Sequence, residues 1–201
     1  MADKVFITTS GVGVIKAGRN MAASYIRPGD VAIVNGVLGD HGAAILAARG
    51  DMALLADIKS DCQGLGHLME ALLQAIPDVR CARDATRGGV ASALNEMAEA
   101  ACVSIEINET ALPIRSEVKG MCEILGLDPL YLANEGTLIV FVPEDQAEKA
   151  LEVMRATPEG RDSTVIGQAT AGVCGRVSMK TIFGGARIVD MLVGEQLPRI
   201  C

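Results

Sequence analysis

The sequence has almost no aromatic side chains: they make up 2% of its 201 residues, and tryptophan is absent. Half of the residues are nevertheless apolar, so Leu, Ile, Val, Met and Ala can build a sizeable core. No apolar run approaches the roughly 20 residues that a membrane-spanning helix needs. The first residues also lack the apolar stretch of a signal peptide. These absences predict a soluble, cytoplasmic protein without a membrane partner.

Clustered positive charge and metal-ligand patterns are missing too. The formal net charge is -7, and no run of lysine and arginine occurs, so a nucleic-acid partner is not expected. With two histidines and no Cys-x-x-Cys pair, a zinc or histidine-rich metal centre is not expected either. In a cytosolic chain the six cysteines should be free thiols, with Cys81, Cys102 and Cys122 in the core.

The apolar spacing predicts a chain in which strands and helices alternate. Strands are expected at residues 5–9, 31–34, 79–82, 103–107, 138–142, 164–168, 176–179 and 187–190, and helices at 40–48, 65–76, 90–101, 116–125 and 147–154. Asp40 and Ser116 are expected to cap their helices, and Gly126 to end one. Because the order is not a strict βαβ repeat, the expected fold class is α/β (α+β), with a mixed sheet flanked by helices.

The segment Arg-Asp-Ala-Thr-Arg-Gly-Gly at residues 83–89 lies between a predicted strand and a predicted helix. Asp84 could hold Mg²⁺ together with phosphate oxygens, and Arg83 and Arg87 could bind phosphate. A glycine pair at a helix start would let an anion approach the backbone N–H groups. A plain helix start with solvated arginines explains the same pattern.

Two shorter polar motifs follow or precede predicted strands. His41, in Gly39-Asp40-His41-Gly42, could meet an anion at a helix start, or it could be a structural histidine in a capped turn. Asn134 and Glu135 come just before an apolar strand, where the carboxylate could act as a general base. An ordinary polar turn is the alternative there.

The last residue, Cys201, is a thiol at a chain end, where exposure and mobility are expected. It could carry a small group covalently, or it could be incidental. Cys62, which follows Ser60-Asp61 near a predicted helix start, is the rival nucleophile. Residues 191–201 contain Gly194 and Pro198 and are expected to form a flexible tail.

Taken together, the motifs at 39–42, 83–89 and 133–136 and the ending Pro-Arg-Ile-Cys resemble the HypE family. These are carbamoyl dehydratases of [NiFe]-hydrogenase maturation, in the PurM (aminoimidazole ribonucleotide synthetase) superfamily. The resemblance covers essentially the whole chain. It implies a PurM-like C-terminal domain at 26–190, preceded at 1–25 by a strand and linker of a missing N-terminal, ATP-binding half and followed by the tail.

The resemblance also implies a reaction. Cys201 would receive a carbamoyl group from the carbamoyltransferase HypF, and Glu135 would act as the base when ATP drives dehydration to a thiocyanate. The cyanide would then pass to iron on a HypC–HypD scaffold, and the full-length protein would be a homodimer. The chain alone is expected to be inactive. The alternatives are a docking module for HypF or HypC–HypD, and another PurM-type ATP-dependent enzyme.

The family's nucleotide site maps onto four residues of this sequence. The resemblance matches Asp84 to the aspartate that meets Mg²⁺ and nucleotide, and it matches Arg87, Asn134 and His41 to nearby positions. The cofactors expected from it are ATP and Mg²⁺, largely bound by the missing half.

Overall fold

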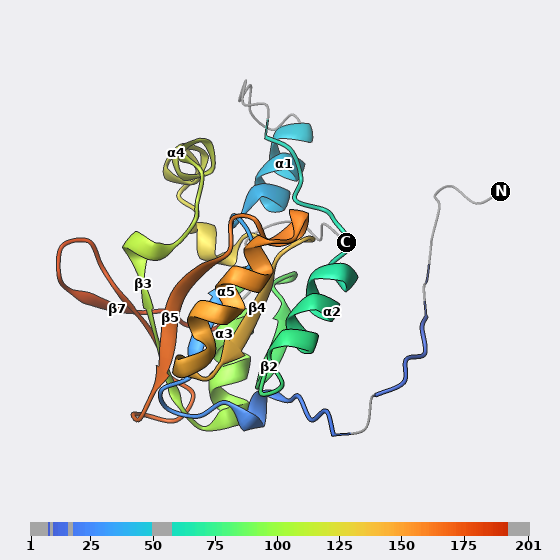
Figure 1. Cartoon of the computed structure of the whole chain (residues 1–201). Helices are drawn as coiled ribbons and strands as arrows, with labels where there is room; N and C mark the ends of the chain where they lie inside the picture. Colours follow the sequence, from blue (N-terminus) through green and yellow to red (C-terminus); the bar gives the residue numbers. More distant parts are fainter. Residues whose placement is uncertain (1–7, 9, 16–17, 50–57, 193–201) are drawn as a thin grey trace.

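The structure, a computed structural model, describes residues 8, 10–15, 18–49 and 58–192. They form one seven-stranded sheet with helices on both faces (Figure 1). The strands are β1 (Val31–Val34), β2 (Cys81–Asp84), β3 (Ser104–Asn108), β4 (Leu138–Val142), β5 (Thr164–Thr170), β6 (Val177–Lys180) and β7 (Ala186–Ile188). The helices are α1 (Asp40–Ala48), α2 (Gly66–Ala75), α3 (Gly89–Ala101), α4 (Ser116–Leu125) and α5 (Ala147–Arg155), with short 3-10 turns η1 (Ala23–Tyr25), η2 (Glu109–Ala111), η3 (Pro129–Tyr131), η4 (Glu144–Gln146) and η5 (Pro158–Gly160).

The sheet has the strand order β2-β4-β1-β5-β3-β6-β7. The pair β3–β6 is parallel and the other five pairs are antiparallel, so the expected mixed sheet is confirmed. The strands and helices predicted between residues 31 and 190 are present, with ends shifted by a few residues. The strand predicted at 5–9 falls almost wholly outside the described residues. No helix in the described part of the chain has the length and apolarity of a membrane span.

Both faces of the sheet are buried because helices cover each of them. Ala32 and Val34 of β1 belong to the core cluster that contains the apolar side of α3. Val31 and Ile33 point to the other face, where they join the cluster formed with α2 and α5. Side chains alternate between the two faces along a strand. An unbroken apolar strand is therefore buried in full, as the sequence of β1 predicts.

Two helix starts differ from the prediction. Asp40 and Ser116 are the first residues of α1 and α4, and the N-cap positions are taken by Gly39 and Arg115, without a side-chain cap bond. The Asp40 carboxylate instead pairs with Arg115, which draws it away from the backbone of its own helix. Gly126 ends α4 in the left-handed region, with φ of 67°, as predicted.

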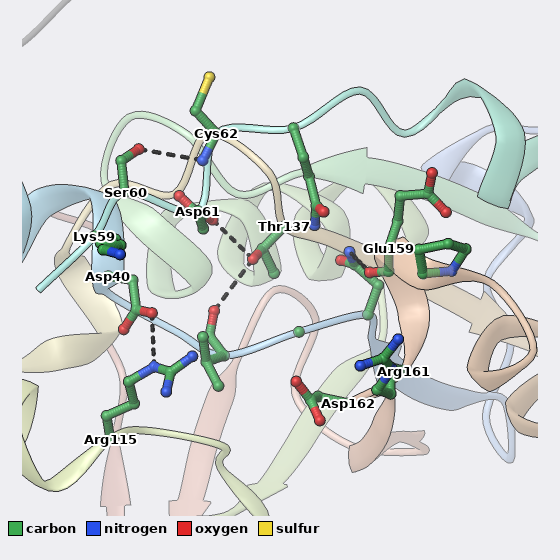
Figure 2. Close-up of a pocket in the computed structure, with 15 residues that line it drawn as sticks. Asp40, Lys59, Ser60, Asp61, Cys62, Arg115, Thr137, Glu159, Arg161 and Asp162 are labelled. Carbon is green, nitrogen blue, oxygen red and sulfur yellow. Dashed lines mark hydrogen bonds and ion pairs between the residues drawn. The ribbon is translucent and has the colours of Figure 1, made fainter.

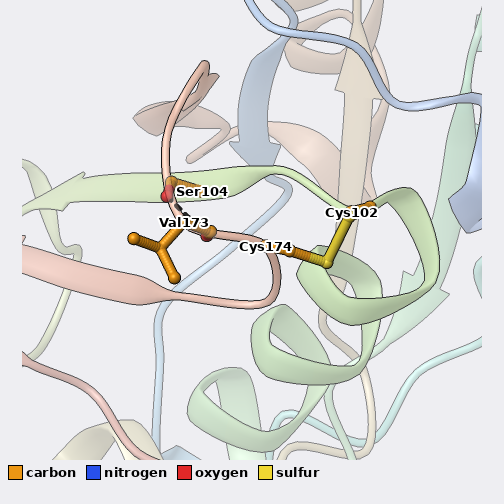
Figure 3. Close-up of a disulfide and its surroundings, with 4 residues drawn as sticks. All are labelled: Cys102, Ser104, Val173 and Cys174. Atoms are coloured by element: carbon orange, nitrogen blue, oxygen red, sulfur yellow. Dashed lines mark hydrogen bonds between the residues drawn. A yellow bond between two sulfur atoms is a disulfide. The ribbon is translucent and has the colours of Figure 1, made fainter.

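The cysteine prediction is wrong for two residues. Cys102 and Cys174 form a disulfide that joins the end of α3 to the turn between β5 and β6 (Figure 3). Strands β5 and β6 lie on either side of β3, so their connection must cross the start of β3 beside Cys102. The turn is held there by the Ser104 hydroxyl, which donates to the Val173 carbonyl at 2.8 Å. Among the described residues, Cys62, Cys81 and Cys122 are free thiols.

The start of α3 depends on a glycine. Gly89 has a φ of 61°, and a Cβ built on it would lie 2.4 Å from the Leu130 carbonyl oxygen. Only glycine therefore allows α3 to begin this close to the backbone of residues 130–132. This contact explains why position 89 of the 83–89 motif must be glycine.

Replacing Gly89 by alanine should lower the free energy of unfolding by about 3 kcal/mol, because a left-handed φ and a backbone clash add together. The matched control is Gly120→Ala within α4, where a Cβ meets nothing within 4 Å. That change should raise stability by about 0.5–1 kcal/mol through helix propensity. Chemical denaturation of both variants checks this, and equal effects would contradict it.

Candidate functional site

The sequence motifs meet where strands β1 and β2 end and strands β4 and β5 begin, at one end of the strands of the sheet. Antiparallel pairing places Val34 opposite Ile139 and Thr164, and Asp84 opposite Leu138. The loops that follow β1 and β2 therefore lie beside the loop that precedes β4. We call this group the strand-end site: it contains Asp84, Arg87, His41, Asp61, Asn134 and Glu135.

Asn134 ties these loops together. Its side chain is 1% exposed. Its amide nitrogen donates to the carbonyls of Ala85 at 3.0 Å and Leu132 at 3.1 Å. Its amide oxygen accepts the backbone N–H of Gly39 at 2.7 Å. The amide is thus committed to backbone groups from three loops, which makes Asn134 a positioning residue. Contact between Asn134 and a nucleotide stays a prediction.

Asp84 and Arg87 are exposed on the loop after β2. The Asp84 carboxylate accepts the Thr86 hydroxyl at 3.0 Å, which leaves further lone pairs available. No side chain in the described part of the chain pairs with Arg87. Arg83 is turned away from this role because it forms an ion pair with Glu96 of α3.

Asp61 is the residue that sequence reasoning missed. Its carboxylate accepts the backbone N–H groups of Glu135 at 3.0 Å and Gly136 at 3.1 Å, and the hydroxyl of Thr137 at 3.0 Å. These bonds dock the segment before α2 onto the loop that carries Glu135. An isolated aspartate in a polar segment has no periodic signal, and its partners lie more than 70 residues away, so only the fold reveals it.

His41 is brought to the same segment from the first turn of α1. Its Nδ1 lies 2.9 Å from the Ser60 hydroxyl oxygen, which also accepts the backbone N–H of Cys62 at 3.2 Å. Glu135 is half-buried on the loop that Asp61 holds. Five of the residues predicted for the site therefore lie close to the strand ends. Asp84 ends β2 and Arg87 is on the loop after it, Asn134 and Glu135 are on the loop before β4, and His41 is in the first turn of α1. The sixth, Cys201, lies outside the described residues.

A polar cavity of about 300 Å³ adjoins these residues (Figure 2). It is lined by Asn35, Gly36, Val37, Asp40, Lys59, Ser60, Asp61, Cys62, Gln63, Arg115, Thr137, Pro158, Glu159, Arg161 and Asp162. Thr137 lies between Asp61 and the Val37 carbonyl, and Cys62 is at the rim with its sulfur directed outward. Cationic and acidic side chains both line the cavity, which suits a small polar ligand more than an apolar one.

Asp40 is the one buried carboxylate of this cavity among the described residues. Burial raises its pKa, and the hydrogen bond from Arg115 Nε at 2.8 Å opposes that rise. Nearby Asp61 raises the pKa further by charge repulsion. The Asp40–Arg115 pair thus fastens the start of α1 to the segment before α4.

The described residues contain no group of three or more His, Cys, Asp or Glu that could hold a metal ion by themselves. A single exposed carboxylate such as Asp84 suits Mg²⁺ only when phosphate oxygens and water complete the coordination. Within the described residues, the strand-end site therefore offers the Asp84 carboxylate, the Arg87 guanidinium and the Glu135 carboxylate, the last on a loop that Asp61 holds by hydrogen bonds.

Asp61→Ala should lower the free energy of unfolding by about 1–2 kcal/mol, because two backbone N–H groups and a hydroxyl lose a charged acceptor. Amide hydrogen exchange at Glu135 and Gly136 should become faster in the same variant. Asp162→Ala is the control, since Asp162 is exposed on the same cavity and forms none of these bonds. Equal stability and equal exchange in the two variants would contradict the anchoring role.

The free thiols should differ sharply in reactivity. Cys62 is exposed, whereas Cys81 and Cys122 are buried. Burial raises the pKa of Cys81, and it raises the pKa of Cys122 to about 11, so few thiolates form there at pH 8. Alkylation of the folded chain at pH 8, followed by peptide mass mapping, should modify Cys62 and spare Cys81 and Cys122. Modification of Cys122 at the rate of Cys62 would contradict this.

Comparison with known proteins gives consistent matches. Residues 27–180 match the family model "AIR synthase related protein, C-terminal domain". The chain is 69% identical over 199 residues to "Carbamoyl dehydratase HypE" of Rhodobacter capsulatus, and 42% identical over 199 residues to the protein of that name from Escherichia coli. Each match covers 99% of this chain and 58% of the relative, so the chain spans less than two thirds of their length.

Solved structures agree with the sequence matches. A crystal structure of the hydrogenase maturation protein HypE in complex with ATP has a TM-score of 0.85 at 43% identity, covering 90% of this chain and 55% of that one. A HypE–HypF complex gives 0.84 at 40% identity, covering 89% and 58%. Thiamine monophosphate kinase from Aquifex aeolicus, at 24% identity and a TM-score of 0.52 over 79% and 52%, shares the fold alone.

Proposed function

Because the chain belongs to the AIR synthase related family, as a member of its HypE group, we propose that it carries a carbamoyl group on Cys201. Dehydration of that group with ATP, in the whole protein, would yield a thiocyanate. This thiocyanate would be the source of the cyanide ligands of the hydrogenase metal centre. The printed names of the relatives, carbamoyl dehydratase and hydrogenase maturation protein, support this proposal.

The reaction sets clear chemical demands. The thiocarbamate Cys–S–C(=O)NH₂ must lose its C–O bond and both N–H protons to become Cys–S–C≡N. The oxygen leaves with phosphate, so the net change is removal of one water coupled to hydrolysis of ATP to ADP and phosphate. A positioned base is required for the protons, and bulk water must be kept from the adduct.

Glu135 is the proposed base. The Asp61 carboxylate holds its backbone N–H at 3.0 Å, and Thr137 and Gly136 complete the same anchor. A carboxylate on a loop fixed in this way can be presented to a reacting group at constant geometry, which proton transfer needs. The His41 ring contacts the Ser60 hydroxyl, next to Asp61 in sequence. It would therefore line the same pocket as Glu135.

Nucleotide would be bound by the part of the strand-end site that contains Asp84 and Arg87. When bound, ATP supplies the phosphate that makes the carbamoyl oxygen a leaving group. The exposed Asp84 carboxylate, which accepts one hydrogen bond from Thr86, fits an Mg²⁺ ligand, and the exposed Arg87 guanidinium, which pairs with no side chain among the described residues, fits a phosphate oxygen. Two such groups do not make a complete nucleotide site, so most contacts would come from beyond this chain.

The observation that carries the proposal is the path of the chain after β7. The side chain of Leu192 approaches Gly88, since its Cδ2 lies 3.8 Å from where a Cβ on that glycine would be. Gly88 belongs to the same loop as Asp84 and Arg87. A segment of nine residues, the length of 193–201, can span at most about 30 Å. The last described residue therefore lies beside the loop that contains Arg87, and this position supports the proposal that Cys201 acts at the strand-end site.

The proposed partners follow from the same reaction. A structure named as a HypE–HypF complex supports HypF as the donor of the carbamoyl group. A HypC–HypD complex would accept the cyanide, and the whole protein would act as a homodimer. These assignments are part of the proposal and share its test.

Incubation of the chain with HypF, carbamoyl phosphate and MgATP should add the mass of one carbamoyl group, located on the peptide that contains Cys201. Intact mass spectrometry followed by peptide mapping measures this. Cys201→Ala should abolish the addition, and Cys62→Ala, which removes the rival thiol, should leave it unchanged. An unmodified chain beside active HypF, or an adduct on Cys62, would overturn the proposal.

A further inference from the structure

The disulfide between Cys102 and Cys174 lies at the surface of the folded chain (Figure 3). Both of its cysteines are exposed, whereas the free thiols Cys81 and Cys122 are buried. Thiol–disulfide exchange begins when a thiolate attacks one sulfur of a disulfide, so it requires access from solution. Exposed disulfides are therefore the ones that exchange most readily, and this disulfide belongs to that class.

The turn that carries Cys174 is held by hydrogen bonds of its backbone. The Gly175 N–H donates to the Val103 carbonyl at 3.0 Å. The Ile105 N–H donates to the Arg176 carbonyl at 2.8 Å. These two bonds join the turn between β5 and β6 to the chain at the start of β3. Neither of them involves a sulfur atom, so reduction of the disulfide removes neither.

Ser104 adds a side-chain contact to the same turn. Its hydroxyl donates to the carbonyl of Val173, the residue before Cys174, at 2.8 Å. A Cβ built on Gly172 would lie 2.4 Å from the Ser104 hydroxyl oxygen, so the turn packs directly against this side chain. The position of Cys174 is thus set by its neighbours on both sides, at 172–173 and at 175–176.

Cys102 is fixed by the end of α3. It adopts a left-handed φ of 53°, and its N–H donates to the carbonyls of Ala98 and Glu99. The Val103 N–H also donates to the Ala98 carbonyl, at 3.1 Å. These bonds end the helix, and they too are independent of sulfur. Because the backbone holds both cysteines, with Cα atoms 4.3 Å apart, the two thiols of the reduced chain stay within reach of each other.

We propose that Cys102 and Cys174 form a reversible modification site, which exchanges with small thiols and disulfides of the glutathione class while the sheet stays folded. Ser104 is its positioning residue, because it holds the turn that carries Cys174. The redox state of the small thiols then sets whether the end of α3 is covalently joined to the β5–β6 turn. This proposal does not depend on the function proposed above.

The exchange is balanced without any further reactant. A small thiolate attacks one sulfur of the disulfide, forms a mixed disulfide and releases the other cysteine as a thiolate. A second small thiolate attacks the mixed disulfide at the sulfur of the first small thiol. The chain is left with two thiols, which take the two protons of the small thiols, and the small thiols leave as their disulfide. Oxidation of the chain follows the same steps in reverse.

Equilibration in glutathione buffers, followed by acid quenching, alkylation and peptide mass mapping, measures the effective concentration of one thiol at the other. It should exceed about 0.1 M, roughly a hundredfold above the millimolar values of flexibly linked groups. Ser104→Ala should lower it about threefold, because the reduced turn loses a hydrogen bond. The matched control is Ser178→Ala in β6, whose hydroxyl makes no hydrogen bond within the described part of the chain. It should leave the value unchanged.

Two further measurements test exchange in the folded state. Reduction by glutathione should not become faster at urea concentrations below those that unfold the chain, and the reduced chain should keep its circular dichroism spectrum. In oxidised glutathione, Cys102→Ser should accumulate one glutathione on the peptide of Cys174, because the thiol that would displace it is absent. Cys62→Ser should leave the Cys102–Cys174 equilibrium unchanged.

A disulfide that is reduced only when urea unfolds the chain would overturn the proposal, as would loss of the circular dichroism spectrum on reduction. An effective concentration in the millimolar range would do the same, and so would equal values for Ser104→Ala and Ser178→Ala, because each would show that the turn does not hold the thiols together. A Cys102→Ser chain without glutathione on Cys174 would contradict exchange at this site. None of these measurements needs a carbamoyl donor or a nucleotide, so their outcome is separate from the test on Cys201.

Discussion

The arrangement of this molecule depends on the buried amide of Asn134. Its three hydrogen bonds join the loops that follow β1 and β2 to the loop that precedes β4. Because the amide is almost fully buried, losing these bonds would deprive the Gly39 N–H and the Leu132 carbonyl of a partner, at a cost of about 1–3 kcal/mol each. The Ala85 carbonyl would keep the backbone N–H of Asn134. Every other feature of the strand-end site, from the exposed Asp84 to the docked Asp61, is placed relative to loops that this side chain fixes.

Ion pairs contribute much less to that placement. The Arg83–Glu96 pair is close to half-exposed on both partners, and such pairs contribute about 0–1 kcal/mol. Asp61 differs, since its carboxylate accepts two backbone N–H groups and a hydroxyl in a partly buried position. The geometry of the site is therefore set by hydrogen bonds to the backbone and by the close approach at Gly89.

The end of α3 is also fixed by contacts with a distant part of the chain. The disulfide between Cys102 and Cys174 and the bond from Ser104 to Val173 fasten the β5–β6 turn to the end of the helix whose start carries the site. The chain after β7 is then held along α3 by Asn95 and approaches Gly88 at the opposite end. One helix thus contacts the β5–β6 turn at its end, the chain after β7 at its middle and the 83–89 motif at its start.

The sequence by itself determined the strands, the helices and the mixed sheet, because apolar periodicity reports which residues are buried. It also indicated Asp84, Arg87 and Glu135, since polar residues next to the ends of strands gather where the strands end. Tertiary structure alone decided the bonds of Asn134 and Asp61, the pairing of Asp40 with Arg115, the Cys102–Cys174 disulfide and the hydrogen bonds of Asn95 and Tyr131 to the chain after β7. These join residues that are far apart along the chain, and local spacing contains no information about which distant partner the fold brings near.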